Sequence, residues 1–159
     1  MATENIKFKL ELFATKWDKA PTCKIFVNDI CKWQNEVTGT DKAPNIIEFT
    51  HDCEEGKDYK LVIDRAGKDK TQTVVENSEI VKDQLLHIKT IEIDEINIGS
   101  LVFEGIYKPI YPEPWKSQQI ESGAELPETI KNVTAMGHNG TWTLGFSSPF
   151  YMWLLENLY

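Results

Sequence analysis

Apolar and polar side chains alternate near the start of the chain. In IKFKLELFAT, residues 6–15, every second position from Ile6 to Leu12 is apolar and the positions between them are charged. A period of two predicts a strand with one buried face and one wet face. Similar runs at CKIFVN, NIIEFTH and YKLVID are separated by stretches rich in Gly, Pro, Asn and Asp, which predict turns. This spacing predicts an all-β fold, an antiparallel jelly-roll-like β-sandwich.

The longest β-rich run, LLHIKTIEIDEINIGSLVF at residues 85–103, changes phase twice. Its apolar residues come in pairs two apart, with extra residues between the pairs, and each slip moves the next side chains to the opposite face. We therefore expect a bulge or corner near Lys89, another at residues 94–95 and a final strand over residues 101–107. A helix is not expected, because Ile-rich repeats favour strands.

The chain changes character after residue 107. KPIYPEPW contains three prolines, which excludes a central strand or a helix interior and predicts an extended, proline-rich arm. Asn139-Gly140 lies between segments that carry apolar residues and predicts a β-hairpin within this arm. We therefore divide the chain into a β-sandwich domain at residues 1–107 and a C-terminal arm with a hairpin and a short helix at residues 108–159.

The last segment, SSPFYMWLLENLY, is apolar at a terminus, where most chains are polar. Ser148 and Pro149 suit the cap and the first position of a short helix that ends at Leu158. The apolar residues of this helix lie nearly all the way round it. Two alternatives follow: the helix fills an open end of the sandwich, or it docks into an adjacent subunit. The candidate partner-binding residues of the arm and helix are Tyr111, Trp115, Phe150, Tyr151, Trp153 and Leu154.

The net charge and the length of the longest apolar stretch argue against nucleic acid and membranes as partners. The 159 residues include 25 acidic and 17 basic side chains, a net charge of -8, and no Lys/Arg cluster lies beside interleaved aromatic residues. Neither nucleic acid nor an anionic membrane is therefore expected as a partner. The longest apolar stretch, PFYMWLL, is far shorter than the roughly 20 residues that cross a bilayer, so no membrane insertion is expected. The N-terminal MATENIKFKL lacks the pattern of a cleaved export signal.

Signatures of catalysis are missing from the sequence. It contains no G-x-S-x-G, no Gly-rich phosphate loop and no H-E-x-x-H. The three histidines are scattered, so a structural role is expected for each, and no catalytic residue is predicted. The three cysteines are odd in number and lack a C-x-x-C pair, so buried free thiols in a reducing compartment are expected. A bridge between Cys23 and Cys31 is the open alternative.

Ligand binding is favoured over catalysis by the composition. Trp33 and Trp115 are candidates for stacking on sugar rings. Carboxylates near turn carbonyls are candidates for calcium ligands, because calcium prefers oxygen. The candidate acids are Asp18, Asp29, Asp64 and Asp94. Each also has a simpler interpretation as a packing or turn residue, and no D-x-D-x-D loop is present, so no metal ligand is predicted and bound calcium stays an alternative.

Several stretches together resemble a known family. These are APTCKIFVND, IIEF, GKDYKLVIDRAGK, EIVKDQLLHIKTIEIDEINIG, YKPIYPEPW and SPFYMWLLENLY, which run from Ala20 to the last residue. The succession resembles a family of small β-sandwich virion proteins from tailed bacteriophages of aquatic bacteria. The resemblance implies a structural subunit of a tail, baseplate, fibre attachment or capsid decoration, assembled in the host cytoplasm.

The N-terminal part also resembles jelly-roll carbohydrate-binding modules that bind xylan with calcium. This likeness rests on the VND turn after an early strand and on the IEIDEINI run at residues 91–98. The stretch after Lys68 departs from that family, because it lacks an obvious paired-Asp calcium loop. We therefore predict a non-enzymatic assembly protein of a virion that binds other virion subunits or further copies of itself. The alternative is a calcium-assisted module that recognises a cell-surface glycan.

Overall fold

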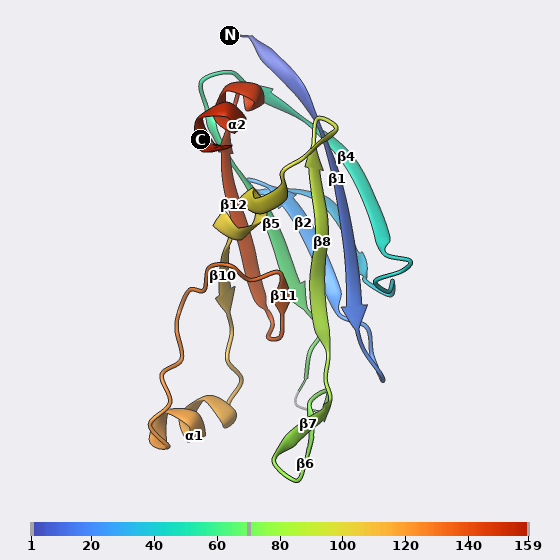
Figure 1. Ribbon diagram of the computed structural model, residues 1–159, viewed down its shortest axis with the longest axis vertical. Coiled ribbons are helices and arrows are strands. Elements are labelled where there is room, and N and C mark those ends of the chain that lie inside the picture. Colours follow the sequence, from blue (N-terminus) through green and yellow to red (C-terminus); the bar gives the residue numbers. More distant parts are fainter. Residues whose placement is uncertain (1, 70, 159) are drawn as a thin grey trace.

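Two antiparallel five-stranded sheets make up most of the protein in the computed structural model, which describes residues 2–69 and 71–158 (Figure 1). The strands of the first sheet are β1 (Thr3–Thr15), β4 (Asn45–Glu54), β8 (Leu85–Ile93), β9 (Ile96–Asn97) and β11 (Ala135–Met136). Those of the second are β2 (Thr22–Val27), β3 (Ile30–Glu36), β5 (Asp58–Ala66), β10 (Ile106–Pro109) and β12 (Gly140–Ser147). The predicted all-β, antiparallel class is confirmed.

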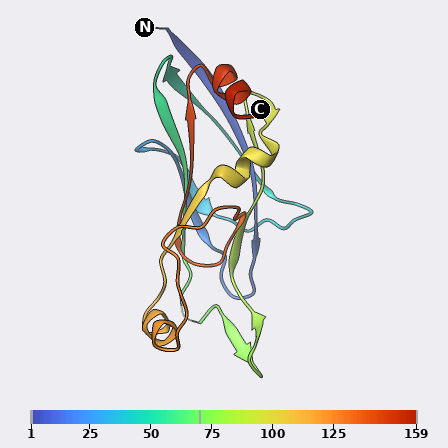
Figure 2. The same ribbon diagram turned by 60° about the vertical axis from the view of Figure 1, so that its left-hand side comes forward.

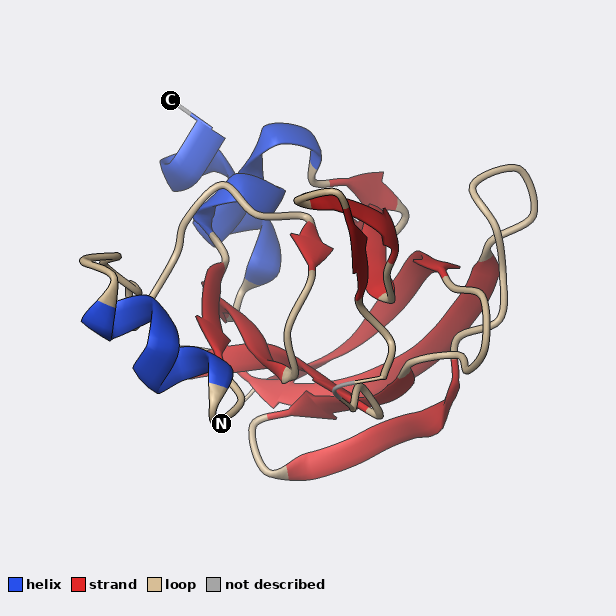
Figure 3. Ribbon diagram, turned by 90° about the horizontal axis from the view of Figure 1, so that it is seen from below, coloured by secondary structure: helices blue, strands red, loops and turns tan. Residues whose placement is uncertain are grey.

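Neighbouring strands of the first sheet follow the order β11, β8, β1, β4, and β9 pairs with the far end of β8. The second sheet has the order β10, β12, β5, β2, β3. A separate two-stranded ribbon, β6 (Val74–Glu76) and β7 (Glu79–Lys82), extends beyond one end of the sheets (Figure 1). The helical elements are η1 (Gly99–Glu104), α1 (Trp115–Glu121) and α2 (Phe150–Leu158), which lie on one side of the strands in the view along the long axis (Figure 3).

The core lies between the two sheets, which are seen side on in Figure 2. The predicted alternation in β1 is confirmed, since its apolar residues from Ile6 to Leu12 are at most 1% exposed. The ring of Phe8 stacks on Phe49 at 5.0 Å within the first sheet and meets Phe146 of the second at 5.8 Å. Complete burial of side chains of this size contributes roughly 1.5–3 kcal/mol each, which makes the sheet contact the main source of stability.

Both predicted irregularities of β8 are present. The pairing of β1 with β8 shifts between Glu11 and Leu12, because Thr90 pairs with Glu11 and Ile88 with Leu12, so Lys89 is the extra residue. The expected corner at residues 94–95 is the turn from β8 to β9, where both residues have positive φ angles, 51° and 67°. The slips in apolar phase therefore mark real breaks in strand geometry.

The predicted strand at residues 101–107 is wrong over its first half. Gly99–Glu104 forms the helical turn η1, in which Leu101 is buried and Phe103 is exposed. Strand pairing begins only at Ile106. The reason is the close approach of Gly105 to Trp142: a Cβ at position 105 would sit inside the indole ring, so the backbone passes over this ring before it joins the sheet.

The predicted hairpin at Asn139-Gly140 is also wrong. The flanking strands belong to different sheets, because β11 pairs with β8 and β12 pairs with β10 and β5. The chain crosses from one sheet to the other here. Since β12 is an interior strand of the second sheet, the sandwich continues to Ser147, and a division at residue 107 leaves one of its interior strands outside it.

Residues between β10 and β11 leave the sandwich and return to it. Ile130 pairs with Tyr107 through two backbone hydrogen bonds of 2.8 and 2.9 Å, so the ends of this excursion meet at the edge of the second sheet. The excursion contains the prolines of the predicted arm and the short helix α1 (Figure 2). The predicted terminal helix is confirmed as α2.

All three cysteines are free thiols, as predicted, and the alternative bridge between Cys23 and Cys31 is not formed. The predicted burial is wrong for Cys31, which is exposed on the edge strand β3. Cys23 and Cys53 are buried in the core, and this burial raises their pKa values to about 12 and about 11. A thiol with such a pKa stays protonated at neutral pH and behaves as a small apolar side chain. These two residues are therefore packing residues.

Candidate functional site

One face of α2 is anchored in the core. Phe150 is fully buried and Leu154 is 5% exposed, while Trp153 is half-buried beside them. The ring of Phe150 contacts Phe146 of β12 at 6.4 Å and Trp153 at 5.7 Å. The inner face of the helix therefore closes the end of the sandwich, which was one of the two alternatives for this segment.

The start of α2 is held by the first strand. The carboxylate of Glu4 accepts the backbone N–H of Phe150 at 3.1 Å. The predicted cap is wrong in this respect, since the Ser148 hydroxyl is buried and has no hydrogen-bond partner among the described residues. A carboxylate at this position also interacts favourably with the positive end of the helix dipole. Sequence reasoning could not find it, because the pattern around α2 contains no sign of a cap from β1.

The outer face of α2 is apolar and exposed. Its residues are Tyr151 (62% exposed), Met152 (59%), Leu155 (55%) and Leu158 (49%). Positions four and three apart lie above one another on a helix, so these side chains form one continuous stripe. We call this stripe the outer face of α2. A contiguous apolar stripe of this kind on a small protein is typical of an interaction surface.

The six predicted partner-binding residues differ in their burial in the structure. Phe150 and Leu154 are core residues, so they are not available as anchors for a neighbour. Tyr151 lies on the outer face of α2, and Trp153 is half-buried at its base. The exposed positions that sequence reasoning did not single out as partner contacts are Met152, Leu155 and Leu158. Since the helix is apolar on every side, only its tertiary packing distinguishes these positions.

Tyr111 and Trp115 lie together on the excursion between β10 and β11. Their ring centroids are 6.0 Å apart, and His138 contacts both, at 5.2 and 5.3 Å. The Tyr111 hydroxyl donates to the Pro127 carbonyl at 2.6 Å, which closes the loop on itself. Trp115 is 36% exposed, so part of its ring faces solvent. This cluster of three rings is the second place where predicted site residues meet.

The backbone next to this cluster is fixed by Tyr107. Its hydroxyl donates to the His138 carbonyl and accepts the His138 N–H at 3.0 Å. Burial raises the pKa of Tyr107 to about 12 and lowers that of His138, so both groups are neutral at pH 7. Trp33, the other predicted sugar-stacking residue, belongs to β3 and packs half-buried against the core. The structure therefore leaves Trp115 as the exposed candidate of the two.

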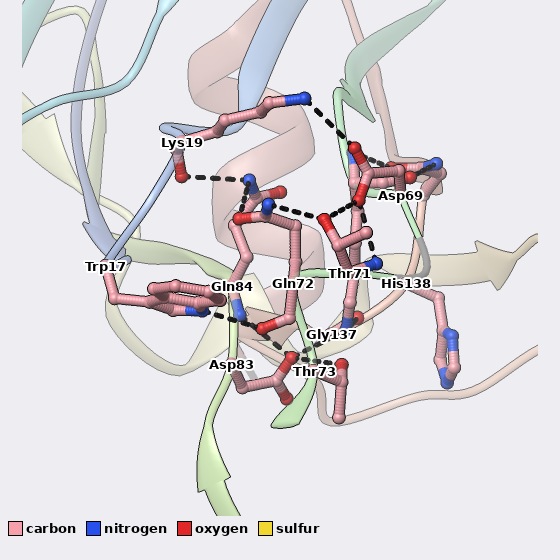
Figure 4. A network of polar contacts seen from close by, with 12 residues as sticks. Trp17, Lys19, Asp69, Thr71, Gln72, Thr73, Asp83, Gln84, Gly137 and His138 are labelled. Carbon is pink, nitrogen blue, oxygen red and sulfur yellow. Dashed lines mark hydrogen bonds and ion pairs between the residues drawn. The ribbon is translucent and has the colours of Figure 1, made fainter. Parts of the chain in front are cut away.

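A buried polar network lies at the same end of the sandwich (Figure 4). Arg65 of β5 is fully buried and donates to Asn139 Oδ1 at 2.8 Å and to the Gln84 carbonyl at 2.7 Å. Asn139 also accepts the Lys68 N–H at 3.0 Å and donates to the Lys68 carbonyl at 2.9 Å. The side chain of Asn139 thus ties the crossing between the sheets to residues 65–68 at the end of β5, which explains why this position is a crossing point and not a hairpin turn.

Asp83 is the acidic centre of this network. Lys68 Nζ lies 2.8 Å from Asp83 Oδ1, and the Thr73 hydroxyl donates to the same oxygen at 2.7 Å. Burial alone would raise the pKa of Asp83, but the hydrogen bonds from Lys68 and Thr73 outweigh it and lower the pKa. The network holds the base of the β6–β7 ribbon, where Trp17 Nε1 also donates to the Gln72 carbonyl at 2.8 Å. Its role is to fix the loops at this end.

The candidate calcium ligands are not brought together. Asp94 accepts the Lys7 N–H at 2.8 Å, and Asp18 accepts the Gln72 side chain at 3.3 Å. Within residues 2–69 and 71–158, no group of three or more His, Cys, Asp or Glu side chains is placed to hold a metal ion. Asp94 and Asp18 instead bond neighbouring segments of the chain.

Comparison with models of known protein families, with curated proteins and with solved structures finds no match for this chain. Its description therefore depends on its own geometry. In the part of the chain that the structure describes, none of the helices has the length and apolar character needed to cross a bilayer. Two surfaces are candidates for function: the outer face of α2 at one end and the Tyr111–Trp115–His138 cluster toward the other (Figure 1).

Proposed function

We propose that this protein is a non-enzymatic assembly subunit of a tailed-bacteriophage virion, and that it contacts a neighbouring subunit through the outer face of α2. The observation that carries the proposal is the division of α2 into two apolar faces. One face is fixed in the core by Phe150 and Leu154, and the other presents Tyr151, Met152 and Leu155 to solvent. A helix held rigidly in this way loses little conformational freedom on binding, which favours a stable contact.

The finer parts of the proposal follow the resemblance of the sequence. The sandwich is proposed to be jelly-roll-like, and the proline-rich segment with Tyr111 and Trp115 is proposed as an arm that adds a second contact. The partners would be other virion subunits or further copies of this chain, in a tail, baseplate, fibre attachment or capsid decoration. Assembly would take place in the host cytoplasm.

The proposal is tested on particles of the virus that encodes the chain. Mass spectrometry of purified particles should detect the protein. The double variant Met152→Ser/Leu155→Ser should fold normally but be missing from the particles. A matched control is Val75→Ser/Ile80→Ser in the β6–β7 ribbon, where the side chains are 57% and 63% exposed and should not affect incorporation. Absence of the wild-type protein from the particles would refute the proposal.

A carbohydrate-binding module is the second candidate function. The observation in its favour is the partly exposed ring of Trp115, supported from behind by His138 and Tyr111. Stacking of a sugar ring on such an aromatic surface is a common form of glycan recognition. The test is a glycan array with and without calcium, comparing the wild type with Trp115→Ala. Failure of the wild type to bind any glycan would remove this candidate.

A further inference from the structure

The end of the sandwich that carries α2 is strongly acidic. Three segments surround the start of the helix: residues 2–6, 52–59 and 147–158. They contain six carboxylates and one lysine, a net charge of -5, which is more than half of the -8 of the whole chain. The carboxylates are Glu4, Asp52, Glu54, Glu55, Asp58 and Glu156, and the lysine is Lys57.

Hydrogen bonds hold these segments together. The Gly56 N–H donates to the Ser148 carbonyl at 2.7 Å, and the Glu55 N–H donates to the Ala2 carbonyl at 2.9 Å. The Ser147 hydroxyl donates to Asp58 at 2.7 Å immediately before the helix. The negative charge is therefore fixed close to the start of α2, at one end of its apolar outer face.

The lysine of these three segments does not offset the charge of their other carboxylates. Lys57 Nζ lies 2.7 Å from Glu54 Oε2, so its charge is already paired. Glu55 and Glu156 are exposed and take part in no ion pair among the described residues. Glu156 lies on α2 itself, one residue after Leu155. A partner that covers the outer face of α2 must therefore approach unpaired carboxylates.

The negative charge near the start of α2 makes some partners of its outer face less favourable than others. A twofold dimer places the same patch of both copies against itself, so it would bring the carboxylates of these segments from both copies together. Juxtaposed like charges cost several kcal/mol at an interface, which disfavours a symmetric dimer through α2. An anionic membrane surface is disfavoured for the same reason.

We infer that the occupant of the outer face of α2 is a segment of a different polypeptide, with apolar anchors flanked by lysine or arginine side chains. This inference rests on the proposed assembly function and narrows the partner from any subunit to a basic, amphipathic one. The apolar stripe provides most of the affinity. The carboxylates raise the rate of association with a basic partner and make the binding specific for it.

The probe for this inference is a synthetic helical peptide of leucine and lysine that carries a fluorescent label. Its control peptide has glutamate in place of every lysine. Fluorescence anisotropy with the full-length protein should show binding of the lysine peptide, at least tenfold weaker binding of the glutamate peptide, and a loss of affinity in about 1 M salt, where the Debye length is ~3 Å. Equal binding of both peptides, or binding of neither, would overturn the inference.

Two charge variants locate the effect. Glu55→Gln/Glu156→Gln removes two exposed carboxylates beside the outer face of α2 and should weaken the lysine peptide about three- to tenfold. Glu125→Gln/Glu128→Gln removes the same charge from exposed positions after α1, toward the other end of the molecule, and should leave binding unchanged (Figure 1). Equal weakening by both pairs would mean a general attraction to an acidic protein, which contradicts the inference.

Leu155→Ser separates this inference from the proposed function. The side chain of Leu155 is 55% exposed, so the variant should fold, which thermal unfolding will show. It should no longer bind the lysine peptide. If the affinity for the lysine peptide falls in Leu155→Ser but is unchanged in Glu55→Gln/Glu156→Gln, the inference of a basic partner is wrong, while the proposed assembly surface on α2 is still supported. Binding that ignores Leu155 overturns both. A dimer of the protein itself at low salt that depends on Leu155 also contradicts the inference.

Discussion

The carboxylate of Glu4 accepts the backbone N–H of Phe150 at 3.1 Å, so the first strand caps the last helix. The two residues are 146 positions apart in the sequence. Their hydrogen bond lies beside the buried ring of Phe150, which packs against Phe146 of the second sheet. The N-terminal strand, the C-terminal helix and the core thus form one unit, and the outer face of α2 is held in a fixed position.

Glu4→Ala should destabilise the protein by about 0.5–2 kcal/mol, because it removes a helix cap. For a chain of this size the melting temperature should fall by about 1–8 °C. Glu4→Gln keeps an acceptor oxygen but loses the charge, so its melting temperature should lie between the two. Circular dichroism measures all three. Identical melting of Glu4→Ala and the wild type would show that the bond contributes nothing.

Leu154 and Leu155 are adjacent residues of one type in opposite environments, 5% and 55% exposed. Leu154→Ala should cost about 2–4 kcal/mol, since it leaves a cavity in the core. Leu155→Ala should change stability by less than about 0.5 kcal/mol. Urea unfolding gives both values. Equal effects would mean that α2 is not oriented as described.

Asn139→Ala should destabilise the protein by about 2–4 kcal/mol. It deprives the fully buried Arg65 of one acceptor and breaks both bonds to the Lys68 backbone. Asn157→Ala serves as the control, because it removes one exposed hydrogen bond from the surface of α2. In urea unfolding, the loss in free energy of unfolding should be several-fold larger for Asn139→Ala than for Asn157→Ala. A loss no larger than that of Asn157→Ala would count against the network.

Stability should decline as the pH falls from 7 toward 5. Burial lowers the pKa of His138, and Lys68 and Arg65 lower it further against the opposing effect of Asp83. The pKa of a histidine in the unfolded chain is about 6.5, so the unfolded state binds the proton first. The stability that a neutral His138 provides is therefore complete above the unfolded pKa and is lost as the pH falls toward the folded pKa.

His138→Phe isolates this effect, because it keeps a ring between Tyr111 and Trp115 and removes the titration. Urea unfolding at pH 7 and pH 5 should show a smaller decline for the variant than for the wild type. Burial also lowers the pKa values of His51 and His87, so part of the decline should remain. An unchanged decline in the variant would exclude His138 as a contributor.

The sequence predicted what depends on local periodicity. The alternation in β1 identified its buried face, and the slip near Lys89 marked a real bulge, because strand geometry repeats every two residues. It failed where distant contacts decide the structure. Gly105 passes over Trp142, and Asn139 is held by Arg65 and Lys68, so neither forms the strand or hairpin that its neighbours suggested.

The candidate site shows the same limit. Sequence reasoning found the apolar terminal helix but could not say which side faces the core, since Leu154 and Leu155 have the same side chain. Tyr111 and Trp115 meet across the short non-helical segment that precedes α1, whereas His138 reaches them only because the chain returns to the sandwich. The carboxylates near the start of α2 come from three separate segments, and only the fold brings them together.

The central claim is the proposed assembly through the outer face of α2, and cross-linking mass spectrometry on purified particles of the proposed virus tests it most directly. Lys57 lies beside the start of α2, through the bond between its carbonyl and the Ser148 N–H at 3.0 Å, and its side chain is 54% exposed. We predict cross-links from Lys57 to lysines of a different polypeptide. Particles without the protein would contradict a role for α2 in assembly, and cross-links from Lys57 only to its own polypeptide would contradict a different polypeptide as the partner.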